Sequence, residues 1–240
     1  MTYEPIKIHS MMLKLSGEAL AGSRGFGYDD EVIDTLTEEI IGLKRLGYSL
    51  AIVLGGGNIF RGGTWKNRSL NRVTLDEIGM LATVQNALYL SEILNAKNYP
   101  TEVFSSQKLD RICRHYSPRK ASLALAAGKI CFLSGGTGNP FFTTDTAAVL
   151  RAVELKLDLV LKGTNVDGLY SSDPRKDSKA KLISSASFDD CLEQKLGVMD
   201  MTAFALARDN SLPIKIFNVS KPGTLCEAVT SAGCGSYIHP

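Results

Sequence analysis

Short apolar runs alternate along the chain with longer segments in which apolar residues recur every three or four positions. The first pattern is typical of buried strands and the second of amphipathic helices, as at Leu36, Ile40 and Leu43. The apolar runs predict strands over residues 11–15, 49–54, 101–104, 130–133, 158–161 and 213–218. The periodic segments predict helices over residues 30–46, 74–94, 118–127, 146–155, 187–196 and 202–210.

The alternation of strands and helices predicts a mostly parallel sheet that is covered by helices on both faces. No low-complexity segment and no linker divides the chain. We therefore expect an α/β fold, a three-layer α/β/α sandwich with a mostly parallel central sheet. It should form a single domain over residues 1–240, with about residues 1–10 as a flexible N-terminal extension.

Glycine-rich turns follow four of the predicted strands, at residues 16–17, 55–58, 134–140 and 162–165. One such turn carries little weight, because tight connections after strands favour glycine in any case. The carboxyl ends of parallel strands share one edge of the sheet, where open α/β sheets bind ligands. Four turns there, mixed with Ser, Thr, Asn and Lys, indicate backbone amides that bind phosphate oxygens. The pattern predicts a nucleotide or polyphosphate site.

Several familiar nucleotide and catalytic motifs are missing from the sequence. It has no G-x-x-x-x-G-K-[ST] loop, no G-x-G-x-x-G after a strand, and no H-R-D with D-F-G pair. None of the three histidines, His9, His115 and His239, lies beside a G-x-S-x-G elbow. The reaction therefore needs no histidine base near these turns, which suits phosphoryl transfer, because that reaction depends mainly on positioning and charge stabilisation.

Phosphoryl transfer needs cations near the phosphates and carboxylates that orient the cations or a metal ion. The chain supplies Lys14, Arg61 and Lys162 as cations at or near these turns, Asp145 as a carboxylate just after Thr143 and Thr144, and Asp200 as one between two predicted helices. Three of these residues have a plainer alternative. Lys14 could be a surface lysine with a buried stem, and the two aspartates could be helix N-caps.

Other polar and aromatic features also allow two interpretations. Phe141 and Phe142 could be core aromatics or could line a nucleotide pocket, and Tyr170 and Asp173 could belong to a simple turn or to a nucleotide site. The basic stretch at residues 111–120 could be a solvated surface, or could contact an anion or another subunit.

Composition narrows the class of protein without identifying the reaction. The 240 residues are 44% hydrophobic and 22% charged with a net charge of +2, which is typical of a globular protein and gives no strong field toward nucleic acid or lipid. The five cysteines form no C-x-x-C pair, so we expect reduced thiols. Residues 1–13 lack a signal-peptide core, and no apolar run is long enough to cross a bilayer. We expect a cytoplasmic protein with no membrane or nucleic-acid partner.

Six segments together resemble the bacterial UMP kinases of the amino acid kinase superfamily. They read K-L-S-G-E-A-L at 14–20, G-G-G-N-I-F-R-G at 55–62, G-M-L-A-T at 79–83, G-T-G-N-P-F-F-T-T-D at 136–145, V-M-D at 198–200 and A-R-D-N at 207–210. The resemblance runs in order from about residue 11 to the C-terminus. The segment at 136–145 is highly specific, whereas the K-L-S-G turn is shared with aspartate and acetylglutamate kinases.

The resemblance implies an enzyme of pyrimidine biosynthesis that transfers the γ-phosphoryl group of ATP to UMP and releases UDP and ADP. Lys14 would stabilise the transferring group, with Asp145 and Asp200 orienting that lysine or Mg²⁺. The implied ATP-binding residues are Lys14, Leu15, Ser16, Gly17, Gly57, Arg61, Thr164, Asn165, Tyr170 and Asp173. The implied UMP-binding residues are Gly56, Asp76, Thr137, Gly138, Asn139, Pro140, Phe141, Phe142, Thr143 and Thr144.

The same resemblance implies an allosteric homohexamer that is activated by GTP and inhibited by UTP. The segment associated with GTP consists of Gly22, Ser23, Arg24, Gly25, Phe26 and Gly27. The chain departs from the family pattern at two of these implied sites. Asn165 stands where the family often has a lysine, and Arg24 stands where an uncharged or acidic residue is common.

Two other functions fit part of the pattern. One is a related kinase that phosphorylates another acceptor, such as carbamate or an amino-acid carboxylate. The other is a nucleotide-sensing module without turnover. Against the sensor, Lys14, Asp145 and Asp200 are all present, and a protein that had lost catalysis would be free to lose them.

Overall fold

The computed structural model describes residues 8–61, 70–194 and 196–240. In these ranges one nine-stranded sheet has the order β4-β3-β5-β2-β1-β6-β10-β11-β9, and its neighbouring strands are parallel except for β10 and β11. A separate antiparallel pair is formed by β7 (Leu169–Tyr170) and β8 (Leu182–Ile183). The strands of the large sheet are β1 (Ser10–Leu15), β2 (Ser49–Leu54), β3 (Thr101–Ser105), β4 (Arg114–His115), β5 (Ile130–Ser134), β6 (Leu159–Thr164), β9 (Ser185–Ser187), β10 (Ile214–Asn218) and β11 (Ser236–His239).

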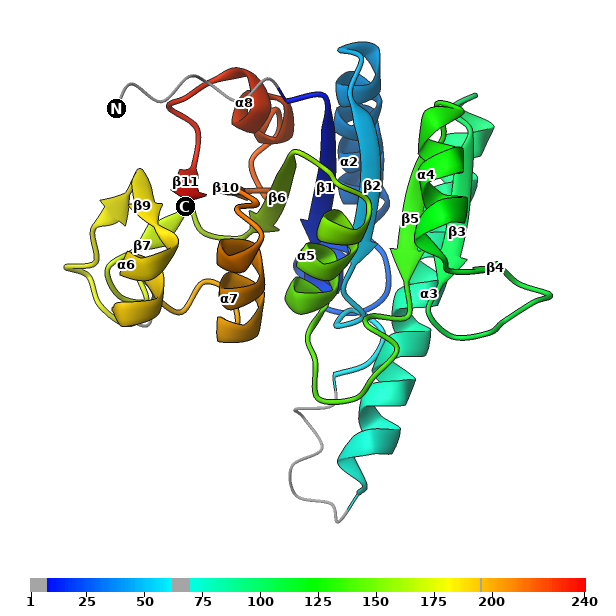
Figure 1. The fold of residues 1–240 in the computed structure, drawn as a ribbon, viewed down its shortest axis with the longest axis horizontal. Coiled ribbons are helices and arrows are strands. Elements are labelled where there is room, and N and C mark those ends of the chain that lie inside the picture. The colour runs from blue at the N-terminus through cyan, green and yellow to red at the C-terminus, as the bar shows by residue number, and fades with distance from the viewer. Residues whose placement is uncertain (1–7, 62–69, 195) are drawn as a thin grey trace.

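Helices cover both faces of the sheet, which confirms the three-layer sandwich (Figure 1). One face packs against α1 (Gly17–Ala21), α2 (Asp30–Arg45), α3 (Arg72–Ala96) and α8 (Thr224–Thr230). The other face packs against α4 (Pro118–Ala126), α5 (Thr144–Glu154), α6 (Phe188–Glu193) and α7 (Met201–Asp209). A 3-10 turn, η1 (Gly22–Arg24), follows α1. Among these helices, none combines the length and apolar character that crossing a bilayer requires.

The alternation of side chains along β1 decides which layer each residue enters. Leu13 and Leu15 belong to the core beneath α2 and α3, whereas Met12 belongs to the core beneath α5. Successive residues of a strand point to opposite faces, so Lys14 must point to the same layer as Met12. A charged residue of a central strand is thereby directed toward the start of α5.

All twelve predicted helices and strands are present, with ends that differ by a few residues. One boundary matters for the site, because β6 continues to Thr164, and Lys162 therefore lies in the strand and not in the turn after it. The prediction was wrong there because β10 pairs with β6 as far as Asn218 and extends the ladder. The pattern did not predict the following short elements: α1, η1, β4, β7, β8, β9, α8 and β11.

The long helix α3 reaches well past the sheet. Its N-terminal half projects beyond the carboxyl ends of β1 and β5 (Figure 1), so its side chains can contact the turns that follow these strands. The extension predicted for residues 1–10 lies mostly outside the described residues, although Ser10 itself begins β1.

Candidate active site

Four adjacent parallel strands bring their glycine turns to one edge. The strands β5, β2, β1 and β6 are neighbours in that order, so the turns after them lie side by side. The turns after β1 and β2 pack backbone against backbone. A Cβ atom added to Gly17 would lie 2.5 Å from Asn58 Oδ1 and 2.6 Å from the amide nitrogen of Gly57. Only glycine fits this contact, which holds the two turns together.

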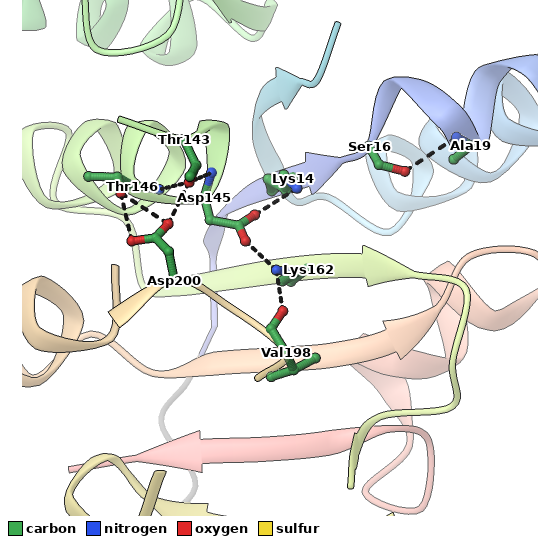
Figure 2. Close-up of polar contacts among 9 residues, drawn as sticks. All are labelled: Lys14, Ser16, Ala19, Thr143, Asp145, Thr146, Lys162, Val198 and Asp200. Carbon is green, nitrogen blue, oxygen red and sulfur yellow. Dashed lines mark hydrogen bonds and ion pairs between the residues drawn. The ribbon is translucent and has the colours of Figure 1, made fainter. Parts of the chain in front are cut away.

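Two lysines and one aspartate form a buried cluster at this edge. Lys14 of β1 lies directly opposite Lys162 of β6 in the parallel ladder. Asp145 at the start of α5 lies between them, with its Oδ1 2.6 Å from Lys14 Nζ and its Oδ2 accepting a hydrogen bond from Lys162 Nζ (Figure 2). Lys162 Nζ also donates to the carbonyl oxygen of Val198 (Figure 2).

The three side chains of this cluster are between 8% and 12% exposed. Burial would raise the pKa of Asp145, but Lys14 and Lys162 outweigh it and hold that pKa below its usual value. Burial lowers the pKa of Lys162, and the nearby charge of Lys14 lowers it further, while Asp145 opposes both effects. With all three groups ionised, the cluster carries one net positive charge, as a site that attracts phosphate requires.

The first turn of α5 brings Asp145 into the cluster. Thr143 is the N-cap, and its hydroxyl accepts from the backbone amides of Asp145 and Thr146. The alternative that Asp145 is itself an N-cap is therefore wrong.

Asp200, by contrast, is the N-cap of α7, and its Oδ1 accepts from the amide of Ala203 at 2.9 Å. Its carboxylate also accepts hydrogen bonds from the hydroxyls of Thr143 and Thr146, which flank Asp145 (Figure 2). Asp200 therefore both caps its own helix and fixes the start of α5.

The predicted ATP residues after β1 and β2 gather beside the cluster. Ser16 caps α1 and accepts from the amide of Ala19 at 3.3 Å. Arg61 donates to the carbonyl oxygen of Gly57 at 3.0 Å, and its guanidinium lies 3.0 Å from a carboxylate oxygen of Glu18. Leu15 is fully buried, so only its backbone can face a nucleotide. Gly62, the last residue of this motif, is outside the described residues.

The remaining predicted ATP residues lie at and beyond the end of β6. Thr164 ends the strand, and Tyr170 lies in β7, half-buried. Asn165 is exposed, and its side-chain oxygen accepts from Arg175. Asp173 is exposed and accepts from the amide of Arg175 at 3.0 Å, as a turn residue would. Thr164 thus lies at the carboxyl end of β6, and the other three residues follow it along the chain.

A cavity of about 160 Å³ opens between α3 and the turn after β5. Six of the predicted UMP residues line it, together with Gly79, Met80, Thr83 and Gly136; the six are Gly56, Thr137, Asn139, Phe142, Thr143 and Thr144. Small-molecule pockets usually measure about 300–1,000 Å³, so this cavity would hold one end of a nucleotide. Thr144 on its wall immediately precedes Asp145, so the cavity adjoins the lysine cluster.

Asp76 ties α3 to the segment that closes this cavity. Its Oδ2 accepts from the backbone amide of Phe141 at 2.8 Å, and its Oδ1 lies 2.7 Å from Arg72 Nε. Phe141 has a φ of 71° and is 67% exposed, and Phe142 is 50% exposed. The alternative that these two rings are core aromatics is therefore wrong. Gly138 and Pro140 belong to the same segment but do not line the cavity.

The segment predicted for GTP lies next to the turn after β2. The amide of Gly27 donates to the carbonyl oxygen of Asn58 at 2.9 Å, and Arg24 donates to the carbonyl oxygen of Tyr28 at 3.0 Å. Phe26 is 70% exposed. Gly22, Ser23 and Gly25 complete the turn beside them.

The basic stretch at residues 111–120 lies on the β3–β4 side of the sheet. Arg114 pairs with Glu102 at 2.6 Å, and most of the stretch is exposed, as a solvated surface would be. A hollow of about 650 Å³ borders this stretch, but no residue of the four glycine turns lines it. Although larger than the cavity at the sheet edge, this hollow is not where the candidate chemistry gathers.

Sequence reasoning left three contacting residues of this site without a role. It named Lys162 as a cation but assigned it none, although the residue stands in an apolar strand just as Lys14 does. It included Thr83 in the family-like segment at 79–83 but gave it no role; the hydroxyl of Thr83 accepts from the amide of Gly135 at 2.8 Å. It missed the buried Arg151, which donates to the carbonyl oxygen of Thr137 at 3.4 Å. For Arg151 no local pattern gave a signal.

The described residues contain no group of three or more His, Cys, Asp or Glu side chains that could hold a metal ion. Both oxygens of Asp145 face lysines, and Asp200 accepts from two hydroxyls and an amide. These carboxylates do not form a ready cage for Mg²⁺. Any magnesium at this edge would need most of its ligands from nucleotide phosphates and water.

The profile of the Amino acid kinase family matches residues 11–218. The chain belongs to this family. It is 46% identical to a protein named uridylate kinase from Stutzerimonas stutzeri (strain A1501), over 95% of this chain and 93% of that protein. It is 47% identical to a uridylate kinase from Photorhabdus laumondii, over 95% of this chain and 94% of that one.

Solved structures agree with these relatives. The crystal structure of a UMP kinase from Bacillus anthracis superposes with a TM-score of 0.92 and 35% identity, covering 96% of this chain and 95% of that one. A UMP kinase from Ureaplasma parvum also has a TM-score of 0.92, with 33% identity over 98% of this chain and 100% of that one. The nine-stranded α/β fold is therefore that of UMP kinases in the amino acid kinase family.

Proposed function

We propose that this kinase transfers the γ-phosphoryl group of ATP to UMP and forms ADP and UDP. One observation carries the proposal: a buried Lys14–Asp145–Lys162 cluster lies between glycine turns on one side and a small cavity on the other. The name uridylate kinase, shared by relatives 46–47% identical over nearly the whole chain, supports UMP as the acceptor.

In the proposed reaction ATP lies against the turns after β1, β2 and β6, and UMP enters the cavity beside α3. A phosphate oxygen of UMP attacks the γ-phosphorus in line. The bond between the γ-phosphorus and the bridging oxygen breaks, and its electron pair leaves with ADP. Acceptor phosphate oxygens are mostly ionised near neutral pH, so the step needs no strong base. Its main difficulty is the approach of two anionic groups.

The lysine cluster addresses this difficulty. Lys14 and Lys162 would stabilise the charge that spreads over the transferring group, while Asp145 keeps the two ammonium groups together and in place. Asp200 would act indirectly: its hydrogen bonds with Thr143 and Thr146 fix the start of α5 and so the position of Asp145. We assign catalytic roles to Lys14 and Lys162 and orienting roles to Asp145 and Asp200.

In this proposal ATP binds as its Mg²⁺ complex. When bound to the nucleotide, the metal ion would neutralise phosphate charge and hold the phosphate chain in one conformation. Asp145 is poorly suited as a direct ligand, because both its oxygens already meet lysines.

Further parts of the proposal rest on the resemblance to bacterial UMP kinases. They are the assignment of the remaining residues to ATP and UMP, a single kinase domain over residues 1–240, a cytoplasmic location, a homohexamer, and regulation by GTP and UTP through residues 22–27. The hydrogen bonds between Gly27 and Asn58 support the last of these, since they connect that segment to the turn after β2.

The test measures ADP release from ATP and Mg²⁺ with UMP, CMP, dUMP and aspartate offered in parallel. We expect turnover with UMP to exceed turnover with each other acceptor by at least tenfold. Preference for aspartate would favour a related kinase with another acceptor. Nucleotide binding without ADP release from any acceptor would favour the sensing module. Either result would overturn the proposal.

A further inference from the structure

A pair of buried asparagine side chains lies beneath the glycine turns, outside all the residues assigned above. Asn58 is the last residue of the turn after β2, and Asn86 lies in the middle of α3; both are fully buried. Each amide donates to the other, from Asn58 Nδ2 to Asn86 Oδ1 at 3.1 Å and from Asn86 Nδ2 to Asn58 Oδ1 at 2.8 Å.

The remaining amide hydrogens of the pair bind the turns themselves. Asn86 Nδ2 donates to the carbonyl oxygen of Gly55 at 2.7 Å, and Asn58 Nδ2 donates to the carbonyl oxygen of Gly27 at 2.9 Å. Both amide groups use two donor hydrogens and an acceptor oxygen, so their orientations are set by their partners. Every polar group of the pair is satisfied, which is what makes a buried network specific in geometry.

One helical turn earlier, α3 holds the other side of the site. Thr83 accepts from the amide of Gly135, the first residue after β5. Thr83 and Asn86 are three residues apart, about 4.5 Å along the helix axis. One turn before Thr83 the backbone of α3 lies against the turn after β2, since a Cβ atom added to Gly56 would be 2.8 Å from the carbonyl oxygen of Gly79. A single rigid helix thus contacts both the donor-side and the acceptor-side turns.

We propose that Asn86, acting through Asn58 and Gly55, is a positioning residue that sets the distance between the donor-side and acceptor-side turns. This inference rests on the proposed phosphoryl transfer. Reacting atoms must approach to about 3–3.5 Å, and a misplacement of about 1 Å can lower a rate about 100-fold. The pair would therefore affect the chemical step more than the binding of either nucleotide, because neither side chain is assigned to a nucleotide.

The test replaces the amide by a group of the same shape, Asn86→Asp. A carboxylate cannot donate to Gly55 or to Asn58, so two of the three hydrogen bonds of this side chain are lost. We expect kcat to fall 10- to 100-fold while KM for ATP and KM for UMP stay within threefold. Burial raises the pKa of a carboxyl group, and its protonated form can donate again. The ratio of variant to native kcat should therefore rise as the pH falls from 8 to 6.

Ser91→Ala is the matched control. Ser91 lies in the same helix, is also buried, and pairs with the hydroxyl of Thr101 at 2.6 Å on the side of β3. This variant should lower Tm without changing kcat. If Asn86→Asp does not fold, Asn86→Ala provides the same separation of kcat from KM. The inference is overturned if a folded Asn86 variant keeps kcat within threefold of native, or if Ser91→Ala loses as much kcat.

Hydrogen exchange provides a readout that does not depend on turnover. The amide of Gly27 donates to Asn58, so its exchange should become at least tenfold faster in the Asn86 variants and stay unchanged in Ser91→Ala. If the native chain released no ADP with UMP, the proposed function would fail, while protection of Gly27 would still show whether Asn86 holds the turns. Unchanged protection in the Asn86 variants would overturn the inference by itself.

Discussion

Replacing Asp145 by asparagine tests the central electrostatic claim, because it keeps the shape of the side chain and removes one charge. In the native chain this carboxylate lies 2.6 Å from Lys14 Nζ and also bonds Lys162. At an effective dielectric constant of about 20, one such contact is worth about 6 kcal/mol before the cost of burial is subtracted. Breaking a buried pair by removing one partner typically costs about 3–5 kcal/mol. We expect Asp145→Asn to lower the free energy of unfolding by that amount at pH 7.

The loss should depend on pH in a defined direction. The pKa of Lys162 is already lowered by burial, and Asp145 is the main group that opposes this. Without that carboxylate the pKa of Lys162 should fall further. Between its folded and unfolded pKa values the unfolded chain binds more protons, so stability rises with pH in that interval. The interval is wider in the variant, and the difference in stability between native and variant should therefore shrink as the pH rises from 7 toward 10.

The stability difference between native and Asp145→Asn below pH 7 gives a second test. The pKa of Asp145 is held below its ordinary value in the folded chain, so its contribution is fully present above about pH 5. It is lost only as the pH falls through the lowered folded pKa. The difference between native and Asp145→Asn should consequently stay constant from pH 7 down to pH 5.

The assay is urea unfolding followed by circular dichroism at pH 5, 7, 8.5 and 10. Asp158→Asn is the control, because Asp158 is a partly buried carboxylate just before β6 whose Oδ2 accepts from Ser10 and from the amide of His9. It should lose stability without the alkaline trend. A variant of Asp145 as stable as native at pH 7, or a gap that stays constant up to pH 10, would refute the reasoning.

Three other substitutions test separate parts of the site. Lys14→Ala should lower turnover by about two to four orders of magnitude, because one of the two cations at the transferring group is lost. The control is Lys215→Ala, which removes a buried lysine two strands away in β10. Near-normal turnover in Lys14→Ala would show that Lys14 has no catalytic role. Asp76→Asn should raise KM for UMP about tenfold, because the Asp76 carboxylate holds the acceptor segment by accepting a charge-assisted hydrogen bond from the Phe141 amide at 2.8 Å. An effect on KM for ATP alone would indicate that Asp76 belongs to the ATP site. Gly17→Ala should lower Tm by about 5 °C, because its Cβ would lie within 2.7 Å of backbone atoms of the next turn. Gly197→Ala is the control, because Gly197 has open space around it. Equal changes of Tm in the two variants would contradict the close packing of Gly17.

The sequence alone predicted much of the fold because the relevant signals are local. The helical period of Leu36, Ile40 and Leu43 requires only neighbours within one helix, and all three are buried under the sheet as expected. Short strands such as β7 and β8, with two residues each, carry too few positions for any period to be detected. Strand β11 is antiparallel and near the C-terminus, and it forms because β10 offers it a hydrogen-bonding edge.

The sequence also determined where the site would lie. A mostly parallel sheet must bring the carboxyl ends of its strands to one edge, so turns that follow different strands become neighbours whatever their separation along the chain. By that rule Ser16, Gly55 and Gly135 were predicted to share one edge of the sheet. It could not give the distances between them.

Only the tertiary structure decided which charges meet. Lys14 lies opposite Lys162 because of the register between β1 and β6, and register depends on hydrogen bonds between strands that no local pattern encodes. Asp145 then joins the two lysines from a helix, and Asn86 reaches Gly55 from another. Such contacts are stable only where burial, hydrogen bonding and opposite charge coincide in space. The sequence showed which residue types were available, but only the packing of strands and helices brought these particular side chains into contact.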